Sequence, residues 1–267
     1  MERVSVRAAG HGILADIDLE IPAGNHVAIV GPSGAGKSSL VGLLLGWHRA
    51  SSGRVCVDGV PLDGQRLAQL RQETAWVDPT VQLWNRPLID NLCYGVHGDA
   101  ASPLGVIIEQ AELRSVLERL PEGLQTPLGE GGGLVSGGEG QRVRLGRALL
   151  RPAVRLVILD EPFRGLDREQ RRELLARARQ LWCEATLFCI THDVGATQTF
   201  ERVLVIDGGR LVEDGAPDVL AAQSCSRYRA LLEAEVTVHE RLWSGPLWRR
   251  LRLEGGRLAD GPAPGGS

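Results

Sequence analysis

A glycine-rich stretch near the N-terminus has the residue types that hold a phosphate chain. Residues 31–40 read GPSGAGKSSL and include Lys37, the only lysine among 30 basic residues. The pattern G-x-x-x-x-G-K-S follows an apolar run, 26–30, that predicts a buried strand, and precedes a predicted helix, 38–47. That context predicts a P-loop, in which backbone N–H groups and a helix N-terminus surround phosphate oxygens. The alternative is a Gly-rich turn with an exposed lysine.

Each position in this stretch has an expected role toward a nucleotide. Lys37 is expected to reach the β- and γ-phosphates, because a compact ammonium fits a tight loop that a wider guanidinium does not. Ser38 is expected to place its hydroxyl on Mg²⁺. The predicted phosphate-binding residues are Gly31, Pro32, Ser33, Gly34, Ala35, Gly36, Lys37, Ser38 and Ser39.

Acidic residues follow a second apolar run that predicts a buried strand. The segment 154–162 reads VRLVILDEP, so Asp160 and Glu161 lie where that strand ends. A parallel neighbour strand delivers such residues to the carboxyl edge of the sheet, where Asp160 can bind Mg²⁺ and Glu161 can polarise a water. His192 follows the next predicted strand, 186–191, and is expected to contact the γ-phosphate; a purely structural histidine is the alternative.

These motifs, taken in order along the chain, resemble the ATP-binding cassette (ABC) family. VSGGEGQR at 135–142 is similar to the family's signature motif, RGLD at 164–167 to its D-loop, and His192 to its switch histidine. The resemblance covers about residues 3–232. It implies a P-loop NTPase of ABC type: an α/β fold with a mainly parallel sheet, an antiparallel β subdomain and a helical signature subdomain at about 83–150.

The resemblance also implies how ATP is bound and used. Two cassettes form a head-to-tail homodimer or heterodimer, and each signature binds the partner's ATP through Ser136, Gly137, Gly138 and Glu139. Asp167 belongs to the D-loop, and the implied catalytic residues are Glu161 and His192. The cofactors implied are ATP and Mg²⁺, with the metal on Ser38 and Asp160.

The segment LPEGLQTPLGEGG at 120–132 is similar to exporter-type cassettes. The implied function is therefore the ATP-binding and ATP-hydrolysing subunit or domain of an exporter-type ABC transporter. Its partner is a transmembrane permease, on a separate chain or trimmed from this one, and its location is the cytoplasmic face of the cell membrane. Two alternatives remain open: a non-transport ABC ATPase of DNA repair or translation, and a regulatory cassette that hydrolyses ATP weakly.

The sequence departs from the family pattern at three places. Ala8 occupies the position of the aromatic residue that stacks on adenine, with His11 as a weak substitute. Pro79 stands where the Q-loop glutamine is usual, and Gln82 is the nearest glutamine that could replace it on Mg²⁺. Glu139 ends the signature where glutamine is usual.

Composition restricts the other function classes. A net charge of −3 and a pI of about 6.1 give no indication of nucleic-acid binding. Five cysteines without metal-ligand spacing predict reduced thiols. The most apolar stretch, 40–47, is far shorter than the roughly 20 residues that span a bilayer.

The predicted domain organisation is one ABC ATPase domain, 1–235, and a partly disordered C-terminal extension, 236–267. Within the extension, residues 251–258 predict a short hairpin; the interleaved Trp and Arg also allow a membrane-facing or anion-facing segment. Other predicted elements are strands at 3–7 and 16–21, hairpins at 53–62 and 202–215, and helices at 106–120, 168–182 and 217–235.

Overall fold

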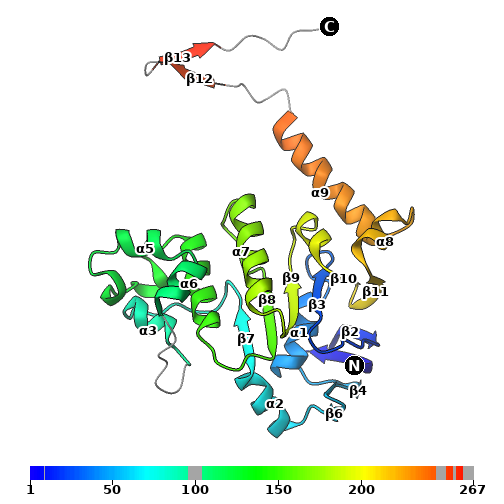
Figure 1. Cartoon of the computed structure of the whole chain (residues 1–267). Helices are drawn as coiled ribbons and strands as arrows, with labels where there is room; N and C mark the ends of the chain where they lie inside the picture. The colour runs from blue at the N-terminus through cyan, green and yellow to red at the C-terminus, as the bar shows by residue number, and fades with distance from the viewer. Residues whose placement is uncertain (9, 96–103, 245–250, 255–256, 261–267) are drawn as a thin grey trace.

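The computed structural model describes residues 1–8, 10–95, 104–244, 251–254 and 257–260. A six-stranded sheet in the order β11-β10-β3-β9-β8-β7 forms its centre (Figure 1). All neighbours in this sheet are parallel except β10 and β11. The strands are β3 (His26–Val30), β7 (Thr74–Val77), β8 (Leu156–Asp160), β9 (Thr186–Ile190), β10 (Arg202–Asp207) and β11 (Arg210–Gly215).

Helices cover both faces of the sheet, which explains why the parallel strands are apolar throughout. Helix α1 (Lys37–Leu45) packs on the face that receives Ile158 of β8. The opposite face receives Leu159 and is covered by α6 (Gly137–Leu149) and α7 (Arg168–Leu181). The predicted α/β fold with a mainly parallel sheet is confirmed.

A separate antiparallel sheet in the order β2-β1-β4 forms the N-terminal part of the molecule. The turn predicted at Asp58 and Gly59 is confirmed, since both residues have positive φ, 54° and 75°, as a two-residue hairpin turn requires. The elements of this part are β1 (Glu2–Ala8), β2 (His11–Ile17), β4 (Ser52–Arg54), β5 (Cys56–Val57), β6 (Val60–Pro61) and α2 (Gly64–Gln72).

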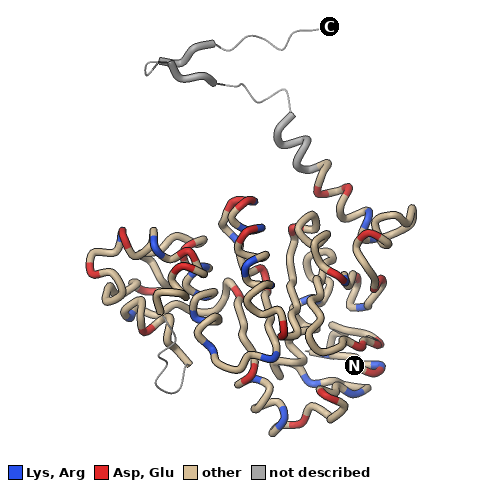
Figure 2. The backbone as a smooth tube through the Cα atoms, in the orientation of Figure 1, with Lys and Arg blue, Asp and Glu red and all other residues tan. Residues whose placement is uncertain are grey.

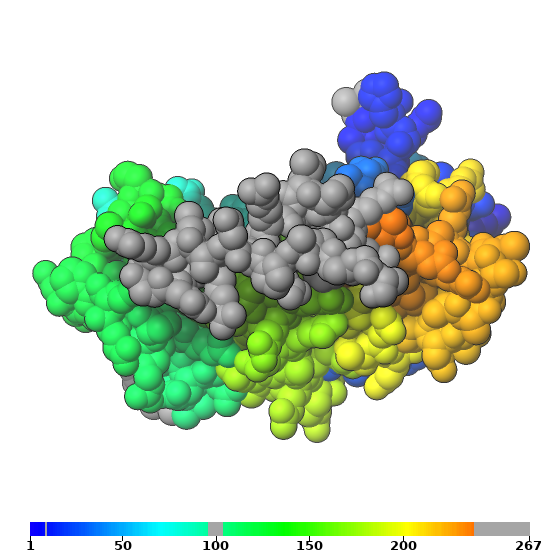
Figure 3. All heavy atoms as spheres, turned by 90° about the horizontal axis from the view of Figure 1, so that it is seen from above, coloured from blue at the N-terminus to red at the C-terminus, as the bar shows by residue number. Residues whose placement is uncertain are grey.

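Short helices form a second lobe at one end of the molecule, called the helical lobe here, which Figure 3 shows in green at the end away from the N-terminal strands. Figure 2 shows that basic and acidic residues are interspersed along the backbone of both parts. The lobe falls within the predicted range 83–150. With α6, its elements are α3 (Leu88–Leu92), α4 (Leu104–Gln110), α5 (Arg114–Arg119), η1 (Gly123–Gln125) and η2 (Glu130–Gly132).

The C-terminal part begins with η3 (Gly195–Thr199) and the hairpin of β10 and β11. Helix α9 (Arg227–Ser244) runs through the domain boundary predicted at residue 235. The hairpin predicted in the extension is present as β12 (Leu251–Glu254) paired with β13 (Arg257–Asp260). The disorder predicted for the end of the chain falls largely outside the described residues.

Two predicted helices are each broken in the structure. The segment 106–120 forms α4 and α5, because Glu112 adopts a left-handed φ of 53° and Leu113 N–H donates to Ile108 O at 2.8 Å. The segment 217–235 forms α8 (Pro217–Ala222) and α9. The break before α9 arises because the Glu213 carboxylate of β11 accepts hydrogen bonds from the N–H groups of Arg227 (2.6 Å) and Tyr228 (2.9 Å).

The strand predicted at 16–21 is also displaced. The observed strand β2 ends at Ile17, and its register follows from antiparallel pairing of Val4 with Ile17 and of Val6 with Leu14. All four of these side chains are buried. Pairing with β1 therefore determined the position of this strand, which the alternation within 16–21 did not reveal.

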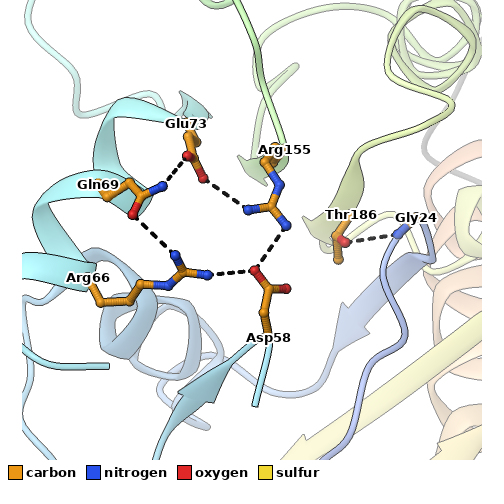
Figure 4. A network of polar contacts seen from close by, with 7 residues as sticks. All are labelled: Gly24, Asp58, Arg66, Gln69, Glu73, Arg155 and Thr186. Atoms are coloured by element: carbon orange, nitrogen blue, oxygen red, sulfur yellow. Dashed lines mark hydrogen bonds and ion pairs between the residues drawn. The ribbon is translucent and has the colours of Figure 1, made fainter. Parts of the chain in front are cut away.

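A polar network ties the amino ends of the parallel strands together (Figure 4). Asp58 accepts from Arg66 at 2.6 Å and from Arg155 at 3.0 Å, and Arg155 also contacts Glu73. Thr186, at the start of β9, accepts from Gly24 N–H at 3.0 Å. These bonds hold the sheet at the edge away from the carboxyl ends, where the predicted site residues lie.

The loop after β3 comes so close to β10 that it requires glycine. A Cβ on Gly31 would lie 2.0 Å from Ile206 O, whereas a Cβ on Gly34 would meet nothing within 4 Å; both have positive φ. We expect Gly31→Ala to lower the free energy of unfolding by at least about 3 kcal/mol, through steric displacement as well as strain. Gly34→Ala should cost only about 1–2 kcal/mol, the strain of left-handed backbone. Urea denaturation of both variants tests this; equal losses would contradict it.

Candidate functional site

The lysine of the glycine-rich loop is buried and held by the loop itself. The loop runs from the end of β3 to Gly36, which has a φ of 102° immediately before α1. The Lys37 side chain is 7% exposed, and its Nζ donates to Gly31 O and Pro32 O, both at 2.9 Å. An ammonium has three N–H donors, so one remains for a ligand in the loop. The P-loop conformation predicted for residues 31–39 is present.

Asp160 and Glu161 face this lysine across the carboxyl edge of the sheet. Burial lowers the pKa of Lys37, and the charges of Glu161 and Asp160 oppose that shift. Burial likewise raises the pKa of Asp160, whose carboxylate accepts a hydrogen bond from Ser38 that opposes the rise. The lysine and both acids therefore form one electrostatic cluster, as predicted from the strand ends.

Ser38 and Asp160 suit a magnesium ion. A hydroxyl and a carboxylate are the hard oxygen ligands that Mg²⁺ takes, and Ser38 is close enough to Asp160 to lower the pKa of its carboxyl. Within the described residues, no group of three or more His, Cys, Asp or Glu side chains could hold a metal by itself. At nucleotide sites Mg²⁺ is bound through one or two carboxylates together with substrate phosphates.

Glu161 and His192 lie side by side at this edge. His192 Nε2 is 3.2 Å from Glu161 Oε1, and the His192 side chain is 55% exposed. Glu161 has a left-handed φ of 47°, and its N–H donates to Ile190 O at 3.0 Å. A non-glycine residue held in this region stores backbone strain, a feature that clusters at functional sites. Burial raises the pKa of the Glu161 carboxyl, and the nearby His192 opposes the rise.

The signature segment begins helix α6 in the helical lobe. Ser136 Oγ accepts from Glu139 N–H at 3.3 Å, and Glu139 Oε2 accepts from Ser136 N–H at 2.8 Å, which together make a capping box. Glu139 also pairs with Arg119 and, at 3.8 Å, with Arg142. The glutamate that replaces the usual glutamine is thus occupied within the chain, while Ser136 and Gly137 remain exposed at the helix start.

The signature and the D-loop are packed against each other within the chain. A Cβ on Gly138 would lie 2.5 Å from Leu166 Cδ2 and 3.1 Å from Gly165 O, so only glycine fits there. Asp167 is exposed and caps α7, accepting from Gln170 N–H at 2.9 Å. The structure therefore groups Gly138 with the D-loop, and groups Lys37 with Asp160 and Glu161.

The segment after Pro79 is anchored by two arginines that sequence reasoning missed. From α6, Arg144 Nε donates to Val81 O at 2.6 Å, and Arg147 Nη1 donates to Gln82 O at 3.3 Å. Arg147 also lies over the Trp84 ring, 4.8 Å from its centroid. In a chain with 29 arginines, nothing in the sequence distinguished these two. The Gln82 side chain is exposed, and its predicted role on Mg²⁺ stays a prediction.

The β1–β2 hairpin lies against the end of the glycine-rich loop, since a Cβ on Gly36 would be 3.1 Å from Ile13 O. Ala8 pairs with His11 there, and both are exposed. Among the described residues of this hairpin no side chain is a phenylalanine, tyrosine or tryptophan that could stack on a base.

Comparison with known proteins agrees with this site. A family model described as "ABC transporter" matches residues 14–164. The "ATP-dependent lipid A-core flippase" of Chromobacterium violaceum is 38% identical over 79% of this chain and 36% of its own length. The protein of the same name from Cupriavidus pinatubonensis is 34% identical over 89% of this chain and 41% of its own length.

A solved structure has the same fold. It is titled "Structure of a bacterial Atm1-family ABC exporter with ATP bound" and superposes with a TM-score of 0.83 and 29% identity, over 88% of this chain and 41% of that one. The chain belongs to the ABC transporter family. It spans little more than a third of the length of the relatives it matches. In the part of the chain that the structure describes, no helix is both long and apolar enough to cross a bilayer.

The geometry around Lys37 predicts that its charge cannot be replaced by another cation. Lys37→Arg should weaken ATP binding roughly tenfold or more, because the buried space that seats an ammonium on two carbonyls does not fit a guanidinium. Lys37→Ala should weaken it further. Isothermal titration with ATP measures both. A Lys37→Arg protein with the affinity of the wild type would refute the steric argument.

The missing aromatic residue at Ala8 predicts a gain-of-binding variant. Base–aromatic stacking is worth about 1–3 kcal/mol, so Ala8→Tyr should tighten ATP binding between about fivefold and a hundredfold. Ala8→Leu is the matched control, which adds apolar volume without a flat ring. Titration of both variants with ATP tests the idea, which fails if Leu and Tyr have the same effect or if neither changes the affinity.

Proposed function

We propose that this chain is the ATP-hydrolysing cassette of an ABC exporter, and that it drives a transmembrane partner from the cytoplasmic face of the membrane. The observation that carries the proposal is the cluster at the carboxyl edge of the sheet. A buried lysine with one free donor faces a Ser–Asp pair and a Glu–His pair whose atoms are 3.2 Å apart. These are the groups that phosphoryl transfer to water requires.

Each group has a distinct part in the reaction. Lys37 and the N–H groups of residues 33–38 bind the phosphates, and Ser38 with Asp160 would hold Mg²⁺, which neutralises charge on the phosphates when bound. Glu161 accepts a hydrogen bond from the attacking water and polarises it. His192, largely exposed beside Glu161, reaches toward the γ-phosphate and keeps Glu161 oriented.

A second cassette completes the site. Ser136 and Gly137 are exposed at the N-terminus of α6, where N–H groups and the helix dipole favour an anion. They belong to the helical lobe, whereas Lys37 belongs to the main sheet. A head-to-tail dimer, with a second copy or a related cassette, lets the signature of one chain bind the ATP held by the P-loop of the other. Asp167, exposed at the start of α7, lies on the surface that such a dimer uses.

The exporter assignment rests on relatives and on one segment of the chain. The relatives are named as flippases and the structural neighbour as an exporter. Residues 120–132, which resemble the exporter-type segment that faces coupling helices, lie in the helical lobe directly after α5 and include η1 and η2. The transmembrane permease is expected to dock on this lobe.

Glu161→Gln separates binding from hydrolysis. The amide keeps the shape of the side chain but loses the charge that polarises water, so ATP hydrolysis should fall about a hundredfold or more while ATP still binds. With ATP and Mg²⁺ the variant should accumulate as a dimer on gel filtration. Phosphate release and elution volume are the two measurements.

The control is Glu169→Gln, an acidic residue exposed in the first turn of α7, which should leave both measurements unchanged. Unchanged hydrolysis in Glu161→Gln would assign the catalytic role elsewhere. A monomer in ATP and Mg²⁺ would argue against the sandwich dimer.

A further inference from the structure

A second aspartate lies beside Asp160 at the edge of the sheet. Strand β7 is parallel to β8, and its last residue, Val77, is in register with Leu159. Asp78 follows directly after β7 and Asp160 ends β8. The two are close enough for the charge of Asp78 to raise the pKa of Asp160. Neighbouring strands in a sheet are only about 4.8 Å apart. The two carboxyl groups therefore lie at one point of the sheet edge.

Both aspartates face the side of the sheet that α1 covers. Trp76 and Ile158 pack into the cluster that contains the α1 side chains, while Val77 and Leu159 pack into the cluster on the opposite face. Because side chains alternate along a strand, the residue after Val77 returns to the α1 face. Asp78 is thus directed to the same side of the sheet as Asp160.

The Asp78 side chain is held so that one oxygen remains free. The residue is 7% exposed, and its Oδ1 accepts from the N–H and the hydroxyl of Thr80, both at 2.6 Å. Among the described residues, Oδ2 accepts no hydrogen bond. Arg144 is close enough to interact with its charge, but the Arg144 Nε is already bonded to Val81 O. Oδ2 therefore remains available to a ligand at the edge of the sheet.

We propose that Asp78 is a further protein ligand of the nucleotide-bound Mg²⁺, through Oδ2, beside Ser38 and Asp160. This inference rests on the proposed ATPase function and extends it. The next residue, Pro79, replaces the usual Q-loop glutamine and has no side-chain oxygen to offer a metal. Two adjacent buried carboxylates repel each other, and a divalent cation between them removes that repulsion. The donor set of two carboxylates and a hydroxyl is still one that Mg²⁺ accepts alongside phosphate oxygens.

Manganese reports on this site directly, without turnover. The affinity of Mn²⁺ for the complex of the protein with a non-hydrolysable ATP analogue is measured by electron paramagnetic resonance. Asp78→Asn should weaken Mn²⁺ binding at least about tenfold, the scale seen when a partner of a metal site is removed. Asparagine keeps the Oδ1 that accepts from Thr80, so the loop is retained. Asp90→Asn, on an exposed position of α3, is the matched control and should change nothing.

A second measurement separates a metal ligand from a structural residue. In excess chelator, Asp78→Asn should bind the analogue as tightly as the wild type or more tightly, because a negative charge beside the phosphates has been removed. Asp78→Cys should favour Cd²⁺ over Mn²⁺ relative to the wild type, since a thiolate selects soft metals. Gln82→Ala is expected to leave Mn²⁺ affinity unchanged.

Several results would overturn the inference. Asp78→Asn with wild-type Mn²⁺ affinity excludes the metal contact, and equal losses with and without metal show a structural role instead. If Gln82→Ala loses Mn²⁺ affinity and Asp78→Asn does not, the metal ligand is Gln82. Failure of the proposed ATPase function gives a different result. In that case the wild type binds the Mn²⁺–analogue complex no more tightly than Lys37→Ala does.

Discussion

The buried ammonium of Lys37 is the interaction on which the rest of the site depends. An isolated charge in this position would be costly, so the fold has to supply partners for it. Two are carbonyls of its own loop, and two are the carboxylates of Asp160 and Glu161 at the end of β8. Strand β9 lies between β3 and β8, and all three strands are parallel. The carboxyl ends of β3 and β8, which carry the loop and the acids, therefore lie at the same edge of the sheet.

Helix α6 connects the signature to the rest of the molecule. Its first residues present Ser136 and Gly137 to solvent, and further along Arg144 and Arg147 bind the carbonyls of Val81 and Gln82. Arg147 is buried, and burial lowers its pKa to about 10. The segment that follows β7 is therefore hydrogen-bonded to the signature helix, which links the carboxyl edge of the sheet to the helical lobe.

The departures from the family pattern have different physical consequences. Glu139 fits the start of α6 as well as glutamine does, because a capping box uses either residue and Arg119 neutralises the added charge. Ala8 has no ring that could stack on a base, and it lies outside the glycine-rich loop. Pro79 has no side-chain oxygen to offer a metal, and it follows Asp78, whose charge acts on Asp160.

The sequence by itself determined the P-loop, the acids at the end of β8, the signature and their order, since each is a local pattern with fixed spacing. It also predicted the turn at Asp58 and Gly59 and the parallel sheet, because an Asp–Gly pair and apolar runs are patterns within a few consecutive residues. Only the tertiary structure decided where α9 begins, since Glu213 of a distant strand caps it. The same holds for the position of Asp78 beside Asp160 and for the contact between Glu161 and His192, because both follow from the register of strands far apart in the chain.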